Sequence, residues 1–327
     1  MKNILLGLTL SLVLTFIFGK IFIPKLANLK AGQPILKYVE THKDKNGTPT
    51  MGGLFFIIAS SISYIVINGV GNRTAIVSLS ISLSFMVVGF LDDFLKIKLK
   101  RNEGLKAYQK ILFLLSIAVI SAFFSYRNGL IIFYLPFTFE VVVLGWWTIP
   151  IVIFIFVAIT NSVNLTDGLD GLASSVSLVY LFFLSIIIYL ELDRTSGVYL
   201  SYENAKSLIS LSFCFIGGLI GFLIFNVNKA KVFMGDTGSL ALGGLIGSVS
   251  VFSLNSFLIP ILGATFVFSA VSVIIQVLYF KKTKKRVFLM APFHHHLQMK
   301  GLTESKIAYI YSLITGIMGT LLIISYL

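Results

Sequence analysis

Three consecutive histidines, His294, His295 and His296, stand between apolar segments in the last part of the chain. Imidazole groups at the edge of such segments serve chemistry or bind an anion more readily than they serve packing. They are too close together for a helical zinc site, which needs spacings such as i, i+4, and consecutive side chains point in different directions. We expect one or two of them to face a ligand; the alternative is a set of satisfied structural residues.

Two adjacent carboxylates, Asp92 and Asp93, follow another apolar stretch. An ionised carboxylate costs about 2.5 to 3.5 kcal/mol at the bilayer centre and less near the interface, so such residues need a cation, a metal ion or a proton-transfer role. Neighbouring helical residues diverge by about 100°, and the pair need not act on the same atom. The alternative is a solvated helix end paired with Lys96 or Lys98.

Residues 161–172 combine several amides, carboxylates and glycines directly after an apolar run. Asn164, Asp167 and Gly171 are spaced by three and four residues, so in a helix they would share one face. Gly168 and Gly171 would let a ligand approach the backbone closely. The alternative, an ordinary loop cap, explains one Asn and one Asp but not this density.

A glycine-flanked carboxylate, Asp236, precedes Thr237 and Ser239 at the start of a further apolar segment. Free backbone N–H groups and the positive end of a helix favour a phosphate there, with a divalent cation beside it; the alternative is a plain N-cap. Residues 45–53 form a turn-rich, lysine-containing entry to an earlier apolar segment, which is weak support for phosphate contact because it is not a Walker sequence.

These segments share an inventory of side chains: carboxylates, amides, lysines and imidazoles, with no activated Ser or Cys nucleophile. The carboxylates are Asp92, Asp93, Asp167, Asp170 and Asp236. This inventory suits phosphoryl transfer, in which positioning and charge stabilisation by Mg²⁺ and cations supply most of the catalysis. The membrane setting indicates that one substrate is a lipid.

The composition sets the elements that must position these groups. The chain has 327 residues, of which 57% are hydrophobic and 12% charged, whereas roughly a quarter of residues are charged in soluble proteins. We therefore expect an all-α polytopic membrane protein. The single cysteine, Cys214, lies inside an apolar run and excludes a disulfide framework or a cysteine-ligated metal cluster.

Ten apolar stretches are long enough, at roughly 17 to 25 residues, to cross a bilayer as helices. They cover about 3–23, 52–70, 75–91, 111–127, 146–164, 171–190, 205–225, 238–255, 257–280 and 306–326. The loops on one side, with the cations that flank them, hold 21 of the 26 Lys and Arg residues, which places that side in the cytoplasm and both termini outside. The net charge of +13 is then mainly an inner-surface charge that attracts anionic lipids.

Between two of these stretches, residues 129–145 on the outer side alternate β-branched and aromatic side chains and predict a small hairpin, with a re-entrant or surface-lying segment as the alternative. No internal repeat or linker divides the chain, so we expect one domain, 1–327.

Five segments together resemble the bacterial phospho-N-acetylmuramoyl-pentapeptide transferase family: residues 48–53, 91–94, 161–172, 232–242 and 292–296. The resemblance follows the whole chain in order. It implies a Mg²⁺-dependent reaction at the cytoplasmic face of the bacterial plasma membrane, in which phospho-MurNAc-pentapeptide passes from UDP-MurNAc-pentapeptide to undecaprenyl phosphate. The products would be lipid I and UMP, in the first membrane step of peptidoglycan synthesis.

The resemblance also assigns roles to residues. It implies that Asp236 binds Mg²⁺, that Asp92 and Asp93 lie near the lipid phosphate, and that Asp92 acts as a base or orienter. The groups placed around the metal and the phosphates are Asn164, Asp167, Asn226, Lys45 and Lys110. Those placed at the nucleotide are Asp170, Gly168, Leu169 and Phe233, and those placed at the amino-sugar and peptide side are His294, His295 and His296.

Some positions depart from the family pattern, and some alternatives stay open. Gln298 and Leu302 stand where related chains more often have Glu and Trp, and residues 228–230 replace a stretch that often contains proline, which puts loop geometry and peptide contacts in doubt. Direct attack of the lipid phosphate is favoured over a covalent phospho-aspartate, but the sequence does not separate the two routes.

Other functions and partners follow from the same features. A sister enzyme that transfers GlcNAc-1-phosphate to a polyprenyl phosphate shares the Asp motifs, and a secondary transporter also uses membrane Asp and His, although it places them near mid-membrane. The expected partners are the two substrates and membrane lipids, with no nucleic acid. A homodimer is left open.

Overall fold

Helices dominate the computed structural model, which describes residues 2–28, 47–99, 103–138, 140–227 and 229–327. The described residues contain ten helices of 16 or more residues, and each overlaps one of the ten apolar stretches. They are α1 (Lys2–Asn28), α2 (Gly53–Asn68), α3 (Arg73–Leu99), α4 (Ala107–Arg127), α5 (Thr148–Thr166), α6 (Leu172–Thr195), α7 (Tyr202–Asn226), α8 (Gly235–Phe252), α10 (Ala264–Thr283) and α12 (Glu304–Tyr326).

Eight helical segments of the described chain are long and apolar enough to cross a membrane by length and composition. The other two of the ten are α2, with 16 residues, and α8, with 18. The prediction of an all-α polytopic membrane protein is therefore confirmed.

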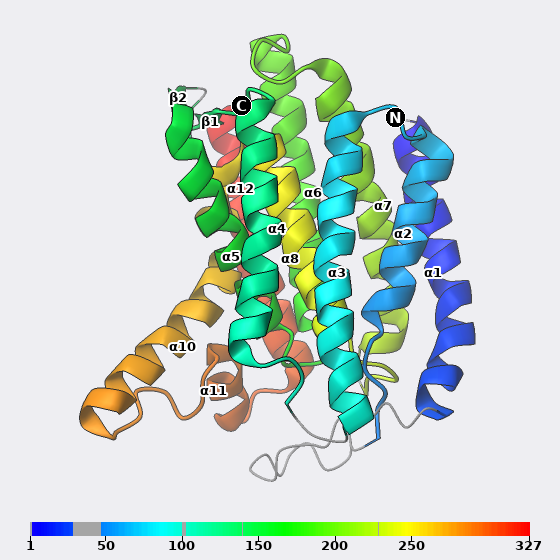
Figure 1. Ribbon diagram of the computed structural model, residues 1–327, viewed down its shortest axis with the longest axis vertical. Coiled ribbons are helices and arrows are strands. Elements are labelled where there is room, and N and C mark those ends of the chain that lie inside the picture. Colours follow the sequence, from blue (N-terminus) through cyan, green and yellow to red (C-terminus); the bar gives the residue numbers. More distant parts are fainter. Residues whose placement is uncertain (1, 29–46, 100–102, 139, 228) are drawn as a thin grey trace.

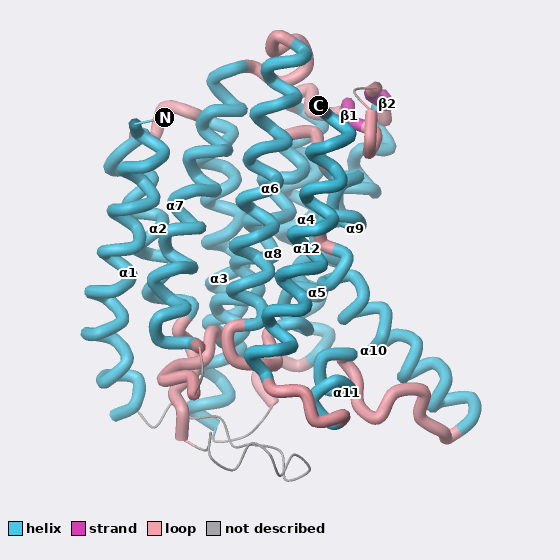
Figure 2. Tube along the Cα trace, turned by 180° about the vertical axis from the view of Figure 1, so that it is seen from behind, coloured by secondary structure: helices cyan, strands magenta, loops and turns pink. Residues whose placement is uncertain are grey.

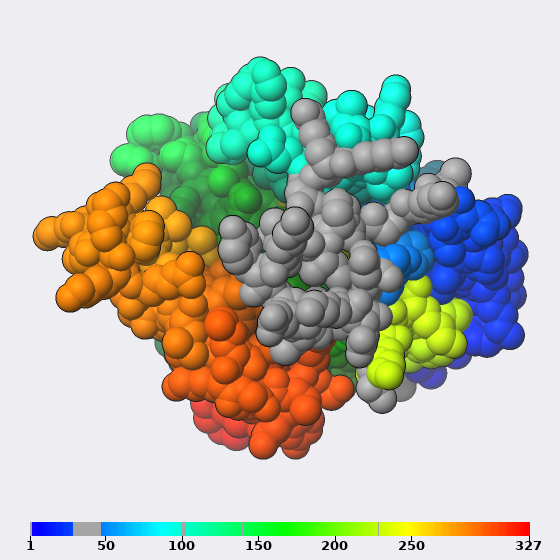
Figure 3. Space-filling view, turned by 90° about the horizontal axis from the view of Figure 1, so that it is seen from below, coloured from blue at the N-terminus to red at the C-terminus, as the bar shows by residue number. Residues whose placement is uncertain are grey.

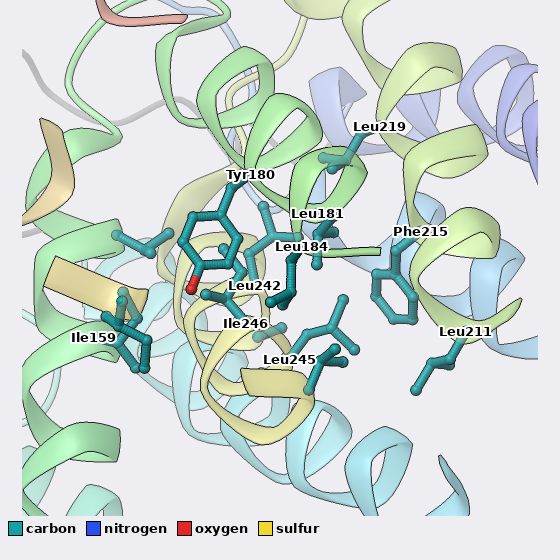
Figure 4. Packing of buried hydrophobic residues seen from close by; sticks show 14 of the residues in the cluster. Ile159, Tyr180, Leu181, Leu184, Leu211, Phe215, Leu219, Leu242, Leu245 and Ile246 are labelled. Atoms are coloured by element: carbon teal, nitrogen blue, oxygen red, sulfur yellow. The ribbon is translucent and has the colours of Figure 1, made fainter. Parts of the chain in front are cut away.

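The helix α8 runs through the middle of the bundle, and every residue from Thr237 to Phe252 is buried (Figure 1). Its many Gly, Ser and Ala residues let neighbouring helices approach closely. Figure 4 shows its apolar side chains among those of α5, α6 and α7; the labelled residues are Ile159, Tyr180, Leu181, Leu184, Leu211, Phe215, Leu219, Leu242, Leu245 and Ile246. Because α8 is surrounded by protein, it does not need the uniformly apolar surface of a lipid-facing helix.

The predicted continuous span at 257–280 is wrong. A short 3₁₀ helix, η3 (Ser256–Leu258), leads into α9 (Ile259–Leu262), which begins with Pro260 in its first turn and ends at Gly263 before α10 starts. Pro260 lies in the first turn of α9, where its missing N–H is tolerated, and the break falls at Gly263, whose φ of −92° and ψ of 26° are not helical. As a result, α10 leans away from the bundle (Figures 1 and 2).

At one end of the bundle lie both termini and the predicted hairpin (Figures 1 and 2). The strands β1 (Ile132–Tyr134) and β2 (Val141–Val143) pair antiparallel, with Phe133 opposite Val142, and a 3₁₀ turn, η2 (Gly145–Trp147), follows. Tyr134 donates its backbone N–H to the carbonyl of Leu254 at 2.9 Å, which ties the hairpin to the end of α8. The hairpin alternative for residues 129–145 is thus confirmed.

The opposite end carries the connections rich in Asp, Asn and His. There α11 (Phe293–Met299) packs between α10 and α12, and the view onto this end shows α10 and α11 on one side and α1 on the other (Figure 3). The motifs singled out in the sequence therefore gather at one end of the helix bundle.

Candidate active site

Three carboxylates from two helices meet at this end. Asp92 and Asp93 lie in the last turns of α3, and Asp236 lies in the first turn of α8. One oxygen of each lies within 4.8 Å of the others, and among the described residues this is the group of acidic side chains that could hold a metal ion. Two motifs that lie far apart in the sequence thus form one site.

Two glycines make this approach possible. A Cβ at Gly89, one turn before Asp93, would collide with the backbone carbonyl of Asp236. Gly235 has φ +73°, where side chains are strained, and a Cβ there would lie 2.5 Å from the Asp93 carboxylate. The helices α3 and α8 can therefore come close enough to bring the three carboxylates together.

Asp93 is fully buried and Asp92 is 3% exposed. Asp93 Oδ2 accepts hydrogen bonds from the backbone N–H of Thr237 at 3.0 Å and from its hydroxyl at 2.7 Å. Asp92 Oδ1 accepts from the backbone N–H of Leu105 at 2.9 Å. One of the free N–H groups at the start of α8, which we expected to meet a phosphate, is thus occupied by Asp93.

Two lysines and an amide hold Asp236. The ammonium groups of Lys96 and Lys110 both lie 2.9 Å from Asp236 Oδ2, and the amide of Asn164 donates to Asp236 Oδ1 at 2.7 Å. Asn164 also donates to the hydroxyl of Ser239 at 2.9 Å. The site is therefore assembled from α3, α4, α5 and α8.

Lys96 also belongs to this site. The sequence interpretation considered it only as a partner of the two aspartates at a solvated helix end. It does pair with Asp92, at 2.7 Å, and it lies 3.7 Å from Asp93 Oδ1. Because its side chain is only 17% exposed and it also contacts Asp236, the pairing belongs to a buried cluster. Its spacing of three and four residues from the two aspartates was the available signal.

The turn-rich entry to α2 pairs with the segment before α8. The backbone N–H groups of Gly52 and Gly53 donate to the carbonyls of Phe233 and Met234 at 2.8 and 2.9 Å, and Phe233 N–H donates to the carbonyl of Pro49 at 2.8 Å. The expected phosphate contact of Lys45 falls outside the described residues. In the described part, from residue 47 onward, these backbone hydrogen bonds join the entry of α2 to the residues just before α8.

The segment 161–172 is helical only as far as Thr166, where α5 ends, and Gly171 with φ +71° precedes α6. The condition under which Asn164, Asp167 and Gly171 would share one helical face is therefore not met, because the helix ends before Asp167. Burial, together with the negative charges of Asp236 and Asp93, raises the pKa of Asp167 well above its usual range. Asp167 thus belongs to the electrostatic environment of the carboxylate cluster.

Asp170 and Asn226 fasten neighbouring loops. Asp170 Oδ2 accepts from the backbone N–H of Ala230 at 2.9 Å, and its own N–H donates to Glu304 Oε2 at 2.8 Å. Asn226 Oδ1 accepts from Gly171 N–H at 3.0 Å. Glu304, at the start of α12, is a further member of this end of the molecule that the sequence interpretation missed, and a lone Glu after Thr303 gave no signal beyond a helix start.

The other residues expected at the nucleotide are neighbours of residues in this hydrogen-bonded group: Leu169 precedes Asp170, and Phe233 follows Val232, whose carbonyl accepts from Asn226. Leu169 is 6% exposed and packs in the apolar core, and its carbonyl accepts from the backbone N–H of Leu172 at 3.2 Å. Phe233 is half-buried.

The rings of His294 and His295 lie side by side, with centroids 4.4 Å apart, whereas His296 turns toward Leu289. His294 is fully buried, and neither ring nitrogen has a hydrogen-bond partner among the described residues. His295 Nδ1 donates to Gln298 Oε1 at 3.1 Å, whereas His296 accepts from the backbone N–H of Leu289 at 3.1 Å. His296 therefore stabilises its own loop.

The histidine motif packs directly on the turn after α5. A Cβ at Gly168 would meet the Nε2 atoms of both His294 and His295. Burial, followed by the neighbouring charge of His295, lowers the pKa of His294 well below its usual range, so its imidazole is neutral at pH 7.

The carboxylate cluster fits a hard divalent cation. Mg²⁺ prefers oxygen ligands and is bound in proteins through one or two carboxylates together with substrate phosphates. Asp93 Oδ1 is buried and has no hydrogen-bond partner among the described residues, although it faces the other two carboxylates. A buried carboxylate oxygen without a hydrogen bond, here 3.7 Å from the ammonium group of Lys96, is a ready ligand for a metal ion.

Comparisons with known proteins identify the family of the chain. Residues 75–254 match the family model described as glycosyl transferase family 4, and residues 45–57 match phospho-N-acetylmuramoyl-pentapeptide-transferase signature 1. The chain is 43% identical over 319 residues to the phospho-N-acetylmuramoyl-pentapeptide-transferase of Clostridioides difficile, covering 97% of this chain and 95% of the relative. It is 41% identical over 321 residues to that of Clostridium novyi, again covering 97% and 95%. The match to that of Caldanaerobacter subterraneus is 39% over 315 residues and covers 96% of each. On this similarity, which extends over nearly the whole chain, the protein belongs to the phospho-N-acetylmuramoyl-pentapeptide-transferase family.

Proposed function

We propose that this protein transfers phospho-MurNAc-pentapeptide from UDP-MurNAc-pentapeptide to undecaprenyl phosphate, with release of UMP and formation of lipid I. The observation that carries the proposal is the meeting of Asp92, Asp93 and Asp236 with Lys96 and Lys110 at one end of a bundle of apolar helices. Carboxylates able to bind a divalent cation, next to ammonium groups able to neutralise phosphate oxygens, are the groups that phosphoryl transfer needs.

The cofactor in this proposal is Mg²⁺, bound by Asp236 together with Asp93. When bound, Mg²⁺ supplies neutralisation of the charge on the diphosphate. The protein's own groups do the rest. Lys110, 21% exposed, is placed to contact a phosphate oxygen beside Asp236, and Asn164 holds Asp236 in its orientation through the 2.7 Å hydrogen bond.

The reaction that we propose is a direct displacement. A phosphate oxygen of the lipid attacks the β-phosphorus of the UDP-sugar, the bond from this phosphorus to the oxygen that bridges the two phosphates breaks, and UMP leaves with that oxygen. Asp92 orients the attacking phosphate or accepts its proton. Each of the three carboxylates is held by hydrogen bonds or lysines, which favours roles in binding and orientation over that of a covalent nucleophile.

The nucleotide and the sugar lie on different sides of the turn after α5 in this proposal. Asp170, the backbone at Gly168 and Leu169, Asn226 and Phe233 form the nucleotide side. Its support is that Asp170 and Asn226 fasten three loops into one surface.

The amino-sugar and its peptide contact His294 and His295 in this proposal. Both imidazoles pack on Gly168, and the ring nitrogens of His294 have no hydrogen-bond partner in the described chain. For His296, the hydrogen bond from Leu289 supports a structural role instead.

We further propose that the protein lies in the bacterial plasma membrane with this site on the cytoplasmic face. The excess of Lys and Arg at the loops of this end supports that orientation. The lipid tail can stay in the bilayer, and the exposed apolar side chains of α10, among them Phe268, Ile274 and Leu278, offer it a protein surface at the same end.

The test is an assay of UMP release from the purified protein. UDP-MurNAc-pentapeptide and UDP-GlcNAc are offered separately, each with undecaprenyl phosphate and Mg²⁺. We expect UMP from the first substrate only, no release with EDTA, and recovery when Mg²⁺ is restored. Equal release from UDP-GlcNAc would favour the sister GlcNAc-1-phosphate transferase, and movement of a solute across vesicles without UMP release would favour a transporter.

A further inference from the structure

Lys96 occupies the centre of the carboxylate cluster. Its ammonium group lies 2.7 Å from Asp92 Oδ2, 2.9 Å from Asp236 Oδ2 and 3.7 Å from Asp93 Oδ1. These are the same three residues whose oxygens could hold a metal ion. The lysine and a divalent cation therefore compete for one set of oxygens.

The hydrogen bonds of the three carboxylates show which of their oxygens Lys96 occupies. Asp236 Oδ2 is shared by Lys96 and Lys110, and Asp236 Oδ1 accepts from Asn164. Asp92 Oδ1 accepts from Leu105, and Asp92 Oδ2 pairs with Lys96.

Asp93 Oδ2 accepts twice from Thr237, which leaves only Asp93 Oδ1 without a hydrogen bond among the described residues. A cation that takes Asp93 Oδ1 together with Asp92 Oδ2 or Asp236 Oδ2 must displace Lys96 from that oxygen.

The charges indicate when this exchange becomes favourable. Three carboxylates and two ammonium groups leave one negative charge, too little to hold a divalent cation strongly while both lysines stay. A nucleoside diphosphate brings further negative charge and gives each displaced ammonium group a new partner. Cation and diphosphate should therefore bind together more strongly than either binds alone.

We propose that Lys96 is the resident counter-ion of the cluster: it holds the place of the divalent cation in the metal-free protein and moves to the diphosphate when the two bind together. Lys96 is thus a positioning residue that couples metal binding to nucleotide binding. This inference rests on the proposed function, because it assumes that a divalent cation and a diphosphate share this site.

The experiment measures Mn²⁺ binding to the full chain in detergent micelles, by the electron paramagnetic resonance signal of free Mn²⁺, with and without UDP. Protein-free titrations correct for Mn²⁺ bound by UDP itself. In the unmodified protein we expect UDP to tighten Mn²⁺ binding by about tenfold, within the range of roughly 5- to 150-fold typical of coupled sites. In Lys96→Met, Mn²⁺ alone should bind about tenfold more tightly than in the unmodified protein, and UDP should add less.

Two matched variants separate charge from packing. Lys98→Met removes the same charge from an exposed position two residues further along α3 and should behave like the unmodified protein. Lys96→Arg keeps the charge and should keep Mn²⁺ binding weak in the absence of UDP. Thermal unfolding of each variant checks that it is folded.

Mn²⁺ affinity without UDP that is unchanged or lower in folded Lys96→Met would overturn the role of Lys96 and leave the metal site standing. Absence of coupling between UDP and Mn²⁺ in the unmodified protein would overturn it as well, without use of any variant. Absence of Mn²⁺ binding in every protein, with UDP present, would instead overturn the proposed metal-dependent function together with this inference.

Discussion

Substitution of Gly89 by alanine should separate the carboxylates without changing any of them. The added Cβ would collide with the carbonyl of Asp236 and lie 2.6 Å from the backbone N of Thr237. Carbon atoms normally stay about 3.5 Å from such atoms, so α3 must move from α8 by roughly 1 Å. The neighbouring atoms belong to the backbone and cannot turn away, so the shift is passed on to Asp92 and Asp93, one turn further along.

The expected loss is larger in activity than in stability. Overpacking costs about 1 to 3 kcal/mol, but alanine regains up to about 1 kcal/mol of helix propensity relative to glycine, which leaves a loss of about 0 to 2 kcal/mol. A displacement of about 1 Å at a reacting centre costs about a hundredfold in rate. Thermal unfolding in detergent and UMP release measure the two effects on one preparation.

Gly316→Ala is the matched control. This glycine also lies inside a helix, α12, but a Cβ there would make ordinary 3.9 Å contacts with Phe183 and Val179. We expect unchanged activity and equal or higher stability. Full activity of Gly89→Ala, with Mn²⁺ affinity within twofold of the unmodified protein, would refute the close approach of α3 and α8 as the cause of the site.

Three further predictions concern single side chains. Asp236→Asn should lower turnover at saturating Mg²⁺ by about a hundredfold or more, with the exposed Asp193→Asn at the other end as control; near-normal activity would remove Asp236 from the metal role. Asp92→Asn should lose rate but keep its affinity for the UDP-sugar, and the reverse result would assign Asp92 to binding. Because the pKa of His294 is lowered in the folded protein, the unfolded chain binds more protons as the pH falls below about 6.5, and stability should fall with it by up to about 1.4 kcal/mol per pH unit. His294→Leu should flatten this dependence in thermal unfolding measured from pH 7.5 to 5.5, and an equally steep fall in that variant would contradict the assignment.

The fold could be predicted from the sequence as far as it depends on apolar length. Helices that contact lipid must be long and apolar, and these were recognised, as was the alternating pattern of residues 129–145. The break at Gly263 was missed because Pro260 and Gly263 are common within membrane helices, where neighbouring helices satisfy the freed backbone groups. Only packing decides whether such residues interrupt a helix.

The candidate site could be predicted in its residue types but not in its pairings. Asp92, Asp93 and Asp236 were recognised because each carboxylate at a membrane edge needs a partner. The sequence could not show that Lys96 serves all three, since that depends on the close approach of α3 and α8. Nor could it show that Asn226, which the family resemblance assigns to the metal and the diphosphate, accepts a hydrogen bond from Gly171; its contact with a ligand stays a prediction. A short polar side chain that pins a turn carries the same sequence signal as one that binds a ligand.

In the function proposed for this protein, Asp92, Asp93 and Asp236 form one divalent-cation site between α3 and α8. Crystals of the protein soaked with Mn²⁺ and UDP test it most directly, through the anomalous scattering of manganese. We expect a single strong peak among these carboxylates, and its loss in Asp236→Asn. A manganese position away from all three, or a peak that persists unchanged in that variant, would contradict it.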